Sequence, residues 1–253
     1  MTARPVTLVT GGSSGLGAEF ARQCARRGDA VVLVARRRDR LEALAAEIGG
    51  AAHVVAADLS EPEAPARLIE EVERRGFFIE TLINNAGFGL AGRFADLPRG
   101  RQRQMVDLNV AALTDLAHLV LPGMRARKRG GVLNVASTGA FQAGPGIAVY
   151  FATKAYVLSF TEALHQELKG SGVNVSALCP GPTRTEFGAV AGMAGAGFDR
   201  IASGVESVVA AGLSGLESNK AIVIPGFANK LSAQSSRLIP RALMRRMVAS
   251  LKL

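Results

Sequence analysis

The sequence is poor in the residues that build metal sites and disulfide scaffolds. Among its 253 residues there are two cysteines, three histidines and no tryptophan. Cys24 and Cys179 lie far apart in apolar surroundings, so neither a disulfide framework nor a zinc site is indicated. We therefore expect no metal, and a reducing cytoplasm is the compartment that fits best.

Long hydrophobic runs are also missing. No run of 18 apolar residues occurs, so no membrane-spanning helix is expected. The first residues, 1–5, lead into a short apolar run and then glycines, which is not the pattern of a signal peptide.

Acidic residues are absent from the end of the chain. The net charge is +9, but no acid follows Glu217, whereas seven Lys and Arg residues do. The basicity therefore belongs to the tail, 227–253, and we expect no nucleic-acid partner. Leu243, Met244, Met247, Val248 and Leu251 fall on one helical face of this tail, opposite Arg241, Arg245 and Lys252. The pattern favours packing on the domain or on a sister subunit; the alternative is attachment to an anionic membrane surface.

Apolar strand-like runs alternate with helical patterns along most of the chain. A hydrophobic content of 48% is enough for a full core. The alternation predicts βαβ units and a parallel sheet with helices on both faces. Strands are expected at 6–10, 30–35, 51–57, 79–83, 131–137, 173–178 and 221–225, and helices at 18–27, 41–48, 101–127, from 148, and at 205–216.

Glycines follow the first strand. The pattern Thr10-Gly11-x-x-x-Gly15-x-Gly17 stands between a strand and a helix. Glycines let the backbone approach a pyrophosphate, and the next helix N-terminus offers free N–H groups. The sequence therefore favours a nucleotide loop over an ordinary glycine-rich turn.

The second strand ends in arginines instead of an acid. A carboxylate there would bind a ribose diol, whereas Arg36 would accommodate a 2′-phosphate. The pattern favours NADP(H), with NAD(H) still possible; the alternative is a solvated basic helix start. Asp58, after the third strand, either meets the adenine or caps the next helix, in which Pro62 would take an early position.

The most reactive pattern is Tyr150-x-x-x-Lys154 at the start of a helix. Residues four apart share one face, so the ammonium would lie beside the phenol and lower its pKa. Ser137 ends the fifth strand and either faces that phenol or caps a turn. Asn109, inside an apolar helix, either braces a neighbouring strand or holds a water. His53, in a strand, is interpreted as structural and His118 as packing, whereas His165, far from Tyr150 on the same helix, is not expected to be catalytic.

Taken together, these motifs resemble the short-chain dehydrogenase/reductase family. The matching positions run in order from about residue 5 to 225: the glycine loop, Asn84-Asn85-Ala86-Gly87, Asn109, Ser137, Tyr150-x-x-x-Lys154 and Pro180-Gly181. The resemblance implies one Rossmann-type doubly wound domain, 1–226, and hydride transfer between NAD(P)(H) and a carbonyl or alcohol. It also implies a homodimer or homotetramer.

The resemblance assigns roles as well. Tyr150 would be the acid/base, Ser137 would hold the substrate oxygen, Lys154 would bind the nicotinamide ribose, and Asn109 would hold a relay water. The positions expected to bind cofactor are Gly11, Ser13, Ser14, Gly15, Leu16, Gly17, Arg36, Asp58, Leu59, Asn85, Ala86, Gly87, Tyr150, Lys154, Pro180, Gly181, Thr183 and Thr185.

The substrate is predicted only by class. The segment 186–203 is rich in Ala and Gly and is expected to be a lid, and the loops at 88–99 and 138–149 are mostly apolar. A hydrophobic ketone or aldehyde is therefore favoured over a phosphorylated one. Two competing functions are a non-catalytic NADP-binding sensor or scaffold and a membrane-surface protein that uses the basic tail.

Overall fold

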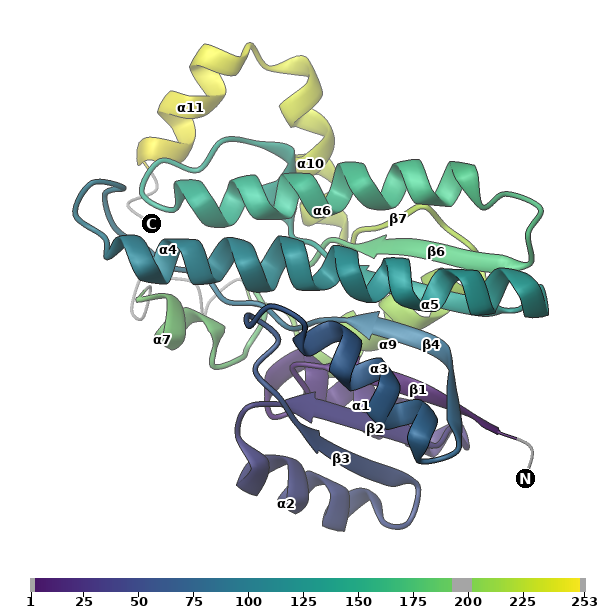
Figure 1. Ribbon diagram of the computed structural model, residues 1–253. Coiled ribbons are helices and arrows are strands. Elements are labelled where there is room, and N and C mark those ends of the chain that lie inside the picture. The colour runs from purple at the N-terminus through teal and green to yellow at the C-terminus, as the bar shows by residue number, and fades with distance from the viewer. Residues whose placement is uncertain (1–2, 193–201, 251–253) are drawn as a thin grey trace.

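One parallel sheet organises the molecule, as the alternating pattern predicts (Figure 1). Within residues 3–192 and 202–250, the part that the computed structural model describes, it has seven strands in the order β3-β2-β1-β4-β5-β6-β7. The strands are β1 (Arg4–Thr10), β2 (Val31–Ala35), β3 (Ala52–Ala56), β4 (Phe77–Asn84), β5 (Gly130–Val135), β6 (Val173–Leu178) and β7 (Ile222–Val223). The order reverses between β1 and β4, so the crevice where open sheets bind ligands lies at their carboxyl ends.

Helices connect these strands and also follow the last one. They are α1 (Gly15–Arg26), α2 (Arg38–Ile48), α3 (Ala64–Arg74), α4 (Arg99–Val106), α5 (Leu113–Arg127), α6 (Ala148–Glu167), α7 (Phe187–Ala191), α9 (Val205–Glu217), α10 (Phe227–Leu238) and α11 (Arg241–Ser250). A short 3₁₀ turn, η2 (Thr138–Phe141), follows β5. The expected lid, 186–203, begins at α7, but its part at 193–201 lies outside the described residues.

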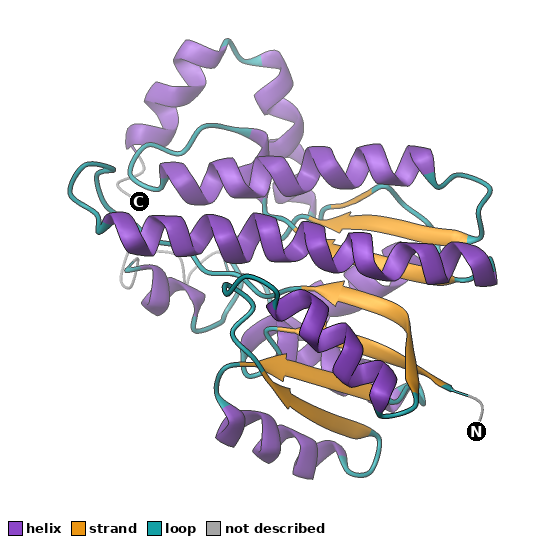
Figure 2. Ribbon diagram, viewed as in Figure 1, coloured by secondary structure: helices purple, strands orange, loops and turns teal. Residues whose placement is uncertain are grey.

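Both faces of the sheet are covered, which confirms the doubly wound architecture (Figure 2). One apolar cluster joins strand residues to α3 and α5, with Leu68 and Leu116 buried at its centre. A second joins the opposite face to α1 and α9, where Phe20 and Val209 are fully buried. Strands that have helices on both faces therefore carry apolar side chains on both faces. The continuous hydrophobic runs in the sequence predict this.

The predicted helix 101–127 is one continuous helix with an irregular middle. Between α4 and α5 lies a π-helical segment, η1 (Asp107–Ala112), which contains Asn109. By length and composition the whole span, Arg99–Arg127, could cross a bilayer, although no such helix was expected. It lies along the sheet with Leu113 and Met124 buried, which is the position of a core helix in a globular domain.

Two local predictions, on Pro62 and on the last strand, are wrong, and one of the two alternatives for Asp58 is excluded. Glu63 adopts φ 62°, and α3 begins after it with Pro65, not Pro62, in its first turn. Asp58 does not cap that helix; its Oδ1 accepts hydrogen bonds from the Ser60 backbone and hydroxyl. The last strand, predicted at 221–225, is only two residues long because pairing with β6 stops at Val223.

The histidines divide between structural and exposed positions. The His53 ring lies 4.7 Å from the Phe77 ring, centre to centre, and His165 Nδ1 lies 2.8 Å from the Val175 carbonyl oxygen, so both are structural. His118 is exposed, which contradicts its interpretation as a packing residue. On α5 the sheet-facing positions are Leu116 and Val120, and position 118 points away from them.

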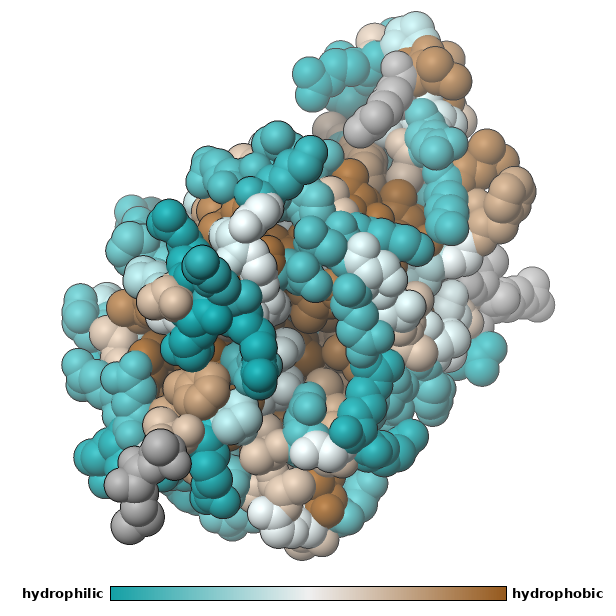
Figure 3. All heavy atoms as spheres, turned by 90° about the vertical axis from the view of Figure 1, so that its right-hand side faces the viewer, coloured by the Kyte–Doolittle hydropathy of each residue, from teal (hydrophilic) through white to brown (hydrophobic). Residues whose placement is uncertain are grey.

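The tail forms two helices at one end of the molecule, α10 and α11, joined by a turn (Figure 1). Ala233, Met244 and Val248 are buried, so part of the tail packs on the domain. The predicted apolar stripe is split, because Leu243 and Met247 are about half exposed; Leu251 lies outside the described residues. In Figure 3, which views the amino ends of the strands, a mostly hydrophilic face carries hydrophobic patches toward the top, where the tail lies.

Candidate functional site

Hydrogen bonds join the glycine loop to the end of β4, the strand on the other side of the point where the strand order reverses. The Thr10 hydroxyl accepts hydrogen bonds from the backbone N–H groups of Asn85 (3.0 Å) and Ala86 (2.9 Å), and Asn85 Nδ2 donates to the Thr10 carbonyl at 2.9 Å. Gly11 adopts φ 68°, a left-handed conformation that favours glycine. A Cβ at Gly17 would overlap the Gly11 carbonyl oxygen. The loop and the first turn of α1 thus pack backbone to backbone.

Arg37, just after β2, contacts this loop. Ser14 is the N-cap residue of α1. Arg37 Nη2 donates to Ser13 Oγ at 3.1 Å and to Ser14 Oγ at 3.2 Å. Leu16 is half-buried and packs against the core. Arg37, which sequence reasoning left out in favour of Arg36, is therefore the arginine in contact with the loop; the run of three arginines was the signal for it.

Arg36 lies on the other side of the strand end, against Asp58. Arg36 Nη1 stands 3.7 Å from Asp58 Oδ2. Burial acts to raise the pKa of Asp58, but hydrogen bonds from Ser60 and the Arg36 charge outweigh it, so the pKa is lowered. Leu59 is buried beside it. The expected adenine and ribose positions thus lie together at the ends of β2 and β3.

Asn109 braces the loop that follows β4. Its Oδ1 accepts from the Phe88 N–H at 3.1 Å, and its Nδ2 donates to the Phe88 carbonyl at 3.0 Å and to Thr153 Oγ1 at 3.1 Å. Thr153 in turn donates to the Tyr150 carbonyl at 2.7 Å. Gly87 lies between Asn109 and Lys154, since a Cβ there would stand 2.9 Å from Asn109 Oδ1 and 3.6 Å from Lys154 Nζ. The amide therefore ties the post-β4 loop to α6.

Ser137, Tyr150 and Lys154 meet at the carboxyl ends of β5 and β6. Lys154 Nζ is buried, donates to the Val135 carbonyl at 2.7 Å, and lies 5.8 Å from the centre of the Tyr150 ring. The Ser137 hydroxyl lies close enough to the Tyr150 phenol to act on its pKa. Ser137 Oγ also accepts from the Gly139 N–H at 3.0 Å as the N-cap of η2, so the capping alternative holds as well. The Phe151 ring packs against Gly139 in this loop, because a Cβ there would stand 3.0 Å from it.

The pKa of Tyr150 differs from the expectation. Burial raises the pKa of Tyr150 to about 12, and the Ser137 hydroxyl acts against this shift. Burial likewise lowers the pKa of Lys154 to about 8. The net direction is thus opposite to the prediction that the phenol pKa is lowered, because desolvation dominates and the group that opposes it is the Ser137 hydroxyl, not the Lys154 ammonium.

The segment after β6 closes the site from a third side. The Thr138 N–H donates to the Pro180 carbonyl at 2.8 Å, which joins this turn to the Ser137 loop. A Cβ at Gly15 would stand 3.2 Å from the Thr185 side chain, and Thr183 bridges to Ser203. The segment therefore borders both loops, with Pro180 against the Ser137 loop, Thr185 against the glycine loop, and Gly181 and Thr183 between them in the sequence.

Sequence reasoning missed two further residues that border the site. Asn229, on the tail helix α10, lies against Gly181, where a Cβ would overlap its amide. Glu186, at the N-cap of α7, pairs with Arg40 at 2.7 Å and with Arg37 at 3.5 Å. Both contacts join segments more than 40 residues apart in the sequence, so no local sequence pattern predicts them.

Apolar side chains surround the phenol. The Tyr150 and Phe187 ring centres lie 5.1 Å apart. Phe88, Ile147 and Ala191 are buried in the same cluster, and Leu90, Val149 and Phe151 pack against it. A polar donor pair, Ser137 and Tyr150, thus faces a mostly hydrophobic surrounding.

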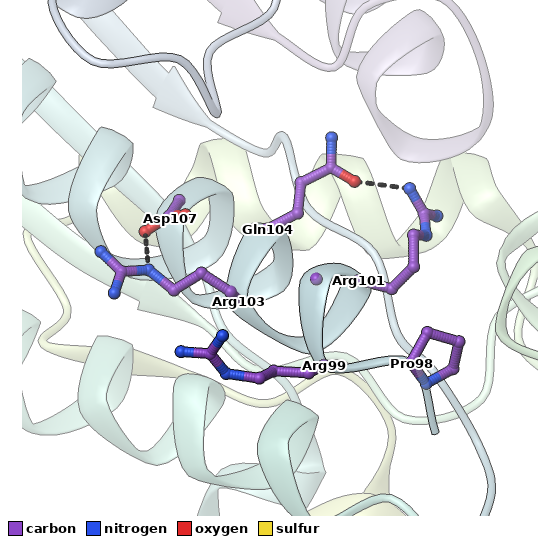
Figure 4. A pocket seen from close by; sticks show the side chains of 7 residues that line it. Pro98, Arg99, Arg101, Arg103, Gln104 and Asp107 are labelled. Carbon is purple, nitrogen blue, oxygen red and sulfur yellow. Dashed lines mark hydrogen bonds and ion pairs between the residues drawn. The ribbon is translucent and has the colours of Figure 1, made fainter. Parts of the chain in front are cut away.

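A separate hollow lies at the start of α4 (Figure 4). It is lined by Pro98, Arg99, Gly100, Arg101, Arg103, Gln104 and Asp107. Its polar groups pair among themselves, with Arg103 Nε donating to Asp107 Oδ1 at 2.8 Å and Arg101 to Gln104. None of the expected site residues lines it.

Comparison with known proteins places this architecture in a family. The family model described as short chain dehydrogenase matches residues 5–193. A serine 3-dehydrogenase from Rhizobium radiobacter is 38% identical over 181 residues, which cover 71% of this chain and 72% of the relative.

Two solved structures extend the likeness over nearly the whole chain. A short-chain dehydrogenase from Sphingobium yanoikuyae in complex with NADPH has a TM-score of 0.83 at 35% identity, with 95% of each chain covered. A 7β-hydroxysteroid dehydrogenase has a TM-score of 0.87 at 28% identity, with 97% of this chain and 96% of the other covered. The chain therefore belongs to the short-chain dehydrogenase/reductase family of oxidoreductases.

Proposed function

We propose that the protein transfers hydride between NADP(H) and a carbonyl or secondary alcohol. The observation that carries the proposal is the meeting of Ser137, Tyr150 and Lys154 at the carboxyl end of the sheet, beside the glycine loop. When bound, the nicotinamide supplies or accepts the hydride. The Ser137 and Tyr150 hydroxyls hold the substrate oxygen, on which negative charge grows during reduction. Tyr150 delivers the proton to that oxygen, or removes it in the reverse direction.

The glycine loop fits the pyrophosphate of a dinucleotide. Gly11 and Gly17 pack so closely that side chains are excluded there, which lets the backbone approach phosphate. The α1 N-terminus lies directly behind the loop, with Ser14 as its N-cap residue. Lys154, with three donors and one used on Val135, has hydrogen bonds left for a ribose.

The arginines favour NADP(H) over NAD(H). Arg36 and Arg37 stand at the end of β2, and Arg37 already contacts Ser13 and Ser14 in the loop. Guanidinium groups match phosphate geometry, whereas a ribose diol is usually read by a carboxylate at this strand end. The similar dehydrogenase from Sphingobium yanoikuyae is in complex with NADPH. NAD(H) remains the second cofactor to test.

A hydrophobic substrate fits the surroundings of the phenol. Phe187 and the apolar cluster beside Tyr150 present hydrophobic side chains to a substrate; among the described residues, the Arg101 guanidinium lies over one member of this cluster, Phe88, 4.8 Å from its ring centre. Apolar pockets with a few polar groups orient small ligands of similar character. We therefore propose an uncharged ketone, aldehyde or secondary alcohol.

The tail is proposed to contribute to assembly. Exposed apolar residues on α10 and α11, namely Phe227, Leu231, Leu238, Leu243 and Met247, offer a surface for a second copy in a homodimer or homotetramer. Basic residues among them keep an anionic membrane surface as the alternative, and a cytoplasmic location fits both. Sedimentation of the full chain, with and without anionic vesicles, separates the two.

Titration with NADPH and NADH tests the proposal directly. We expect NADPH to bind at least about tenfold more tightly than NADH, because one phosphate contact to arginine contributes roughly 1.5–3 kcal/mol. The binding is followed by nucleotide fluorescence, and NADPH oxidation is then assayed with apolar ketones and aldehydes. Equal affinities contradict the assignment of the arginines, and an absence of binding to either nucleotide contradicts the proposed enzyme.

The pH dependence should differ between the two directions. Because the pKa of Tyr150 is raised to about 12, the phenol is protonated at neutral pH and ready to act as an acid. Alcohol oxidation needs the phenolate, whose fraction grows by up to about tenfold per pH unit below that pKa. We therefore expect kcat for oxidation to climb from pH 7 to 10, and kcat for reduction to stay nearly flat from pH 6 to 7.5. An oxidation rate that levels off below pH 8 would contradict the raised pKa.

A further inference from the structure

Arg37 is shared between the glycine loop and the segment that follows β6. One of its terminal nitrogens, Nη2, donates to Ser13 and Ser14 at 3.1 and 3.2 Å. The other, Nη1, stands 3.5 Å from Glu186 Oε2. One terminal nitrogen of the Arg37 guanidinium therefore contacts the glycine loop, and the other faces the Glu186 carboxylate.

Glu186 is held in that place by a second arginine. Arg40 Nη1 donates to both carboxylate oxygens of Glu186, at 2.7 and 3.0 Å. The Arg40 hydrogen bond, with the charges of Arg40 and Arg37, lowers the pKa of Glu186, so the carboxylate is ionised at neutral pH. Its side chain is 49% exposed, and those of Arg37 and Arg40 are 44% exposed. The three groups thus sit at the open rim of the cofactor edge.

A 2′-phosphate at this rim would meet Glu186. The phosphate carries about 1.5 to 2 negative charges at neutral pH. Its expected partners are Arg36 and Arg37, and the Arg37 edge that does not face the loop is already turned toward Glu186. Two anions a few ångströms apart repel each other, and each weakens the hold of the shared guanidinium on the other.

We propose that Glu186 is a specificity-determining residue that competes with the cofactor 2′-phosphate for Arg37 and so limits the preference for NADPH over NADH. The inference rests on the proposed function, because it assumes that the arginines at the end of β2 face the 2′-phosphate. NADH lacks that phosphate and does not compete with Glu186. Removing the negative charge of Glu186 therefore strengthens NADPH binding and leaves NADH binding unchanged.

The test compares two glutamates that each pair with an arginine of the same run. Glu186→Gln keeps the shape and hydrogen-bonding ability of the side chain and removes its charge. Glu42→Gln is the matched control, because Glu42 pairs with Arg38 at 3.5 Å on α2 and is similarly exposed, 58% against 49%, but does not contact Arg37. Affinities of the full chain for NADPH and NADH are measured by isothermal titration calorimetry, after thermal melts show that each variant folds.

Glu186→Gln should bind NADPH about threefold to fivefold more tightly than the wild type, the upper part of the range expected when a partly exposed like charge is removed. NADH binding should stay within about twofold, and Glu42→Gln should match the wild type. The gain should shrink at 1 M salt, where screening acts over about 3 Å. Glu186→Ala should repeat the gain and serves if the Gln variant does not fold.

The contrary outcomes separate the two proposals. NADPH binding that is unchanged or weaker in Glu186→Gln and Glu186→Ala, while the wild type prefers NADPH, overturns the competition alone. An equal gain for both nucleotides also overturns it, because the effect would then not involve the 2′-phosphate. A wild-type protein that binds neither nucleotide overturns the proposed function and this inference with it.

Discussion

Replacing Tyr150 by Phe should lower kcat by about 10²- to 10⁴-fold, the contribution of a positioned general acid. The phenol and the Ser137 hydroxyl are the donors proposed to hold the substrate oxygen, and burial keeps the phenol protonated. Phe retains the ring contacts with Phe187 at 5.1 Å and Phe151 at 6.1 Å, so the fold and the apolar pocket should persist. The affinity for NADPH should change little, since the glycine loop and arginines are untouched.

The chain supplies its own control for this substitution. Its other tyrosine, Tyr156, lies on the same helix but is 41% exposed, and its hydroxyl lies 3.1 Å from Thr114 Oγ1. Tyr156→Phe should leave kcat within about twofold, as expected for an exposed hydroxyl away from the site. Steady-state kinetics on both variants make the comparison. Activity in Tyr150→Phe comparable to that in Tyr156→Phe would refute the assignment of Tyr150 as the acid and favour the sensor or scaffold alternative.

Replacing Gly17 by Ala should abolish tight dinucleotide binding. A Cβ at this position would overlap the Gly11 carbonyl oxygen and stand 2.6 Å from Asn85 Nδ2. Both neighbours are fixed, because Asn85 is bonded to Thr10 across the switch point. The loop must therefore move away from α1. We expect a loss of about 1–3 kcal/mol in the free energy of unfolding from overpacking, and a dissociation constant for NADPH raised at least about tenfold.

A second glycine-to-alanine substitution, in another helix, tests whether the effect at Gly17 comes from the steric clash or from the change in helix propensity. Gly100, in α4, has no neighbour within 4 Å of its would-be Cβ and no left-handed φ. Gly100→Ala should keep NADPH affinity and gain up to about 1 kcal/mol, because Ala is the better helix former. Thermal melts and NADPH titration on both variants give the result. If Gly17→Ala binds NADPH as tightly as Gly100→Ala does, the loop is not the pyrophosphate site.

The family and the order of elements followed from the sequence because they depend on local patterns. Apolar runs of strand length alternate with helical periods, and each chemically distinctive residue stands just after a strand. Since carboxyl ends of parallel strands share one edge of a sheet, Gly11, Asn85 and Ser137 had to gather there once the sheet was parallel. The Tyr150 and Lys154 pair likewise follows from helical spacing.

Properties that depend on distant neighbours came only from the tertiary structure. The sequence placed a cation beside Tyr150 and predicted a lowered pKa, but the apolar cluster around the ring determines the desolvation that raises it. His118 was interpreted as a packing residue because periodicity alone does not say which face of a long helix meets the sheet. The first turn of α3 could equally have held Pro62 or Pro65, since proline suits either position. The left-handed backbone at Glu63 makes the helix begin at Ala64, which places Pro65 in the first turn.

The cofactor rim shows the same division. The run of three arginines at 36–38 predicted a phosphate site. Only the fold shows that Arg37 donates to Ser13 and that Arg36 pairs with Asp58. Glu186 lies 146 residues from Arg40 in the sequence and joins it because the ends of β2 and β6 open onto one crevice. The sequence by itself thus determined which residue types stand at strand ends. The packing of those ends decided their partners, their desolvation and the charges that face them, because all three depend on contacts between segments remote along the chain.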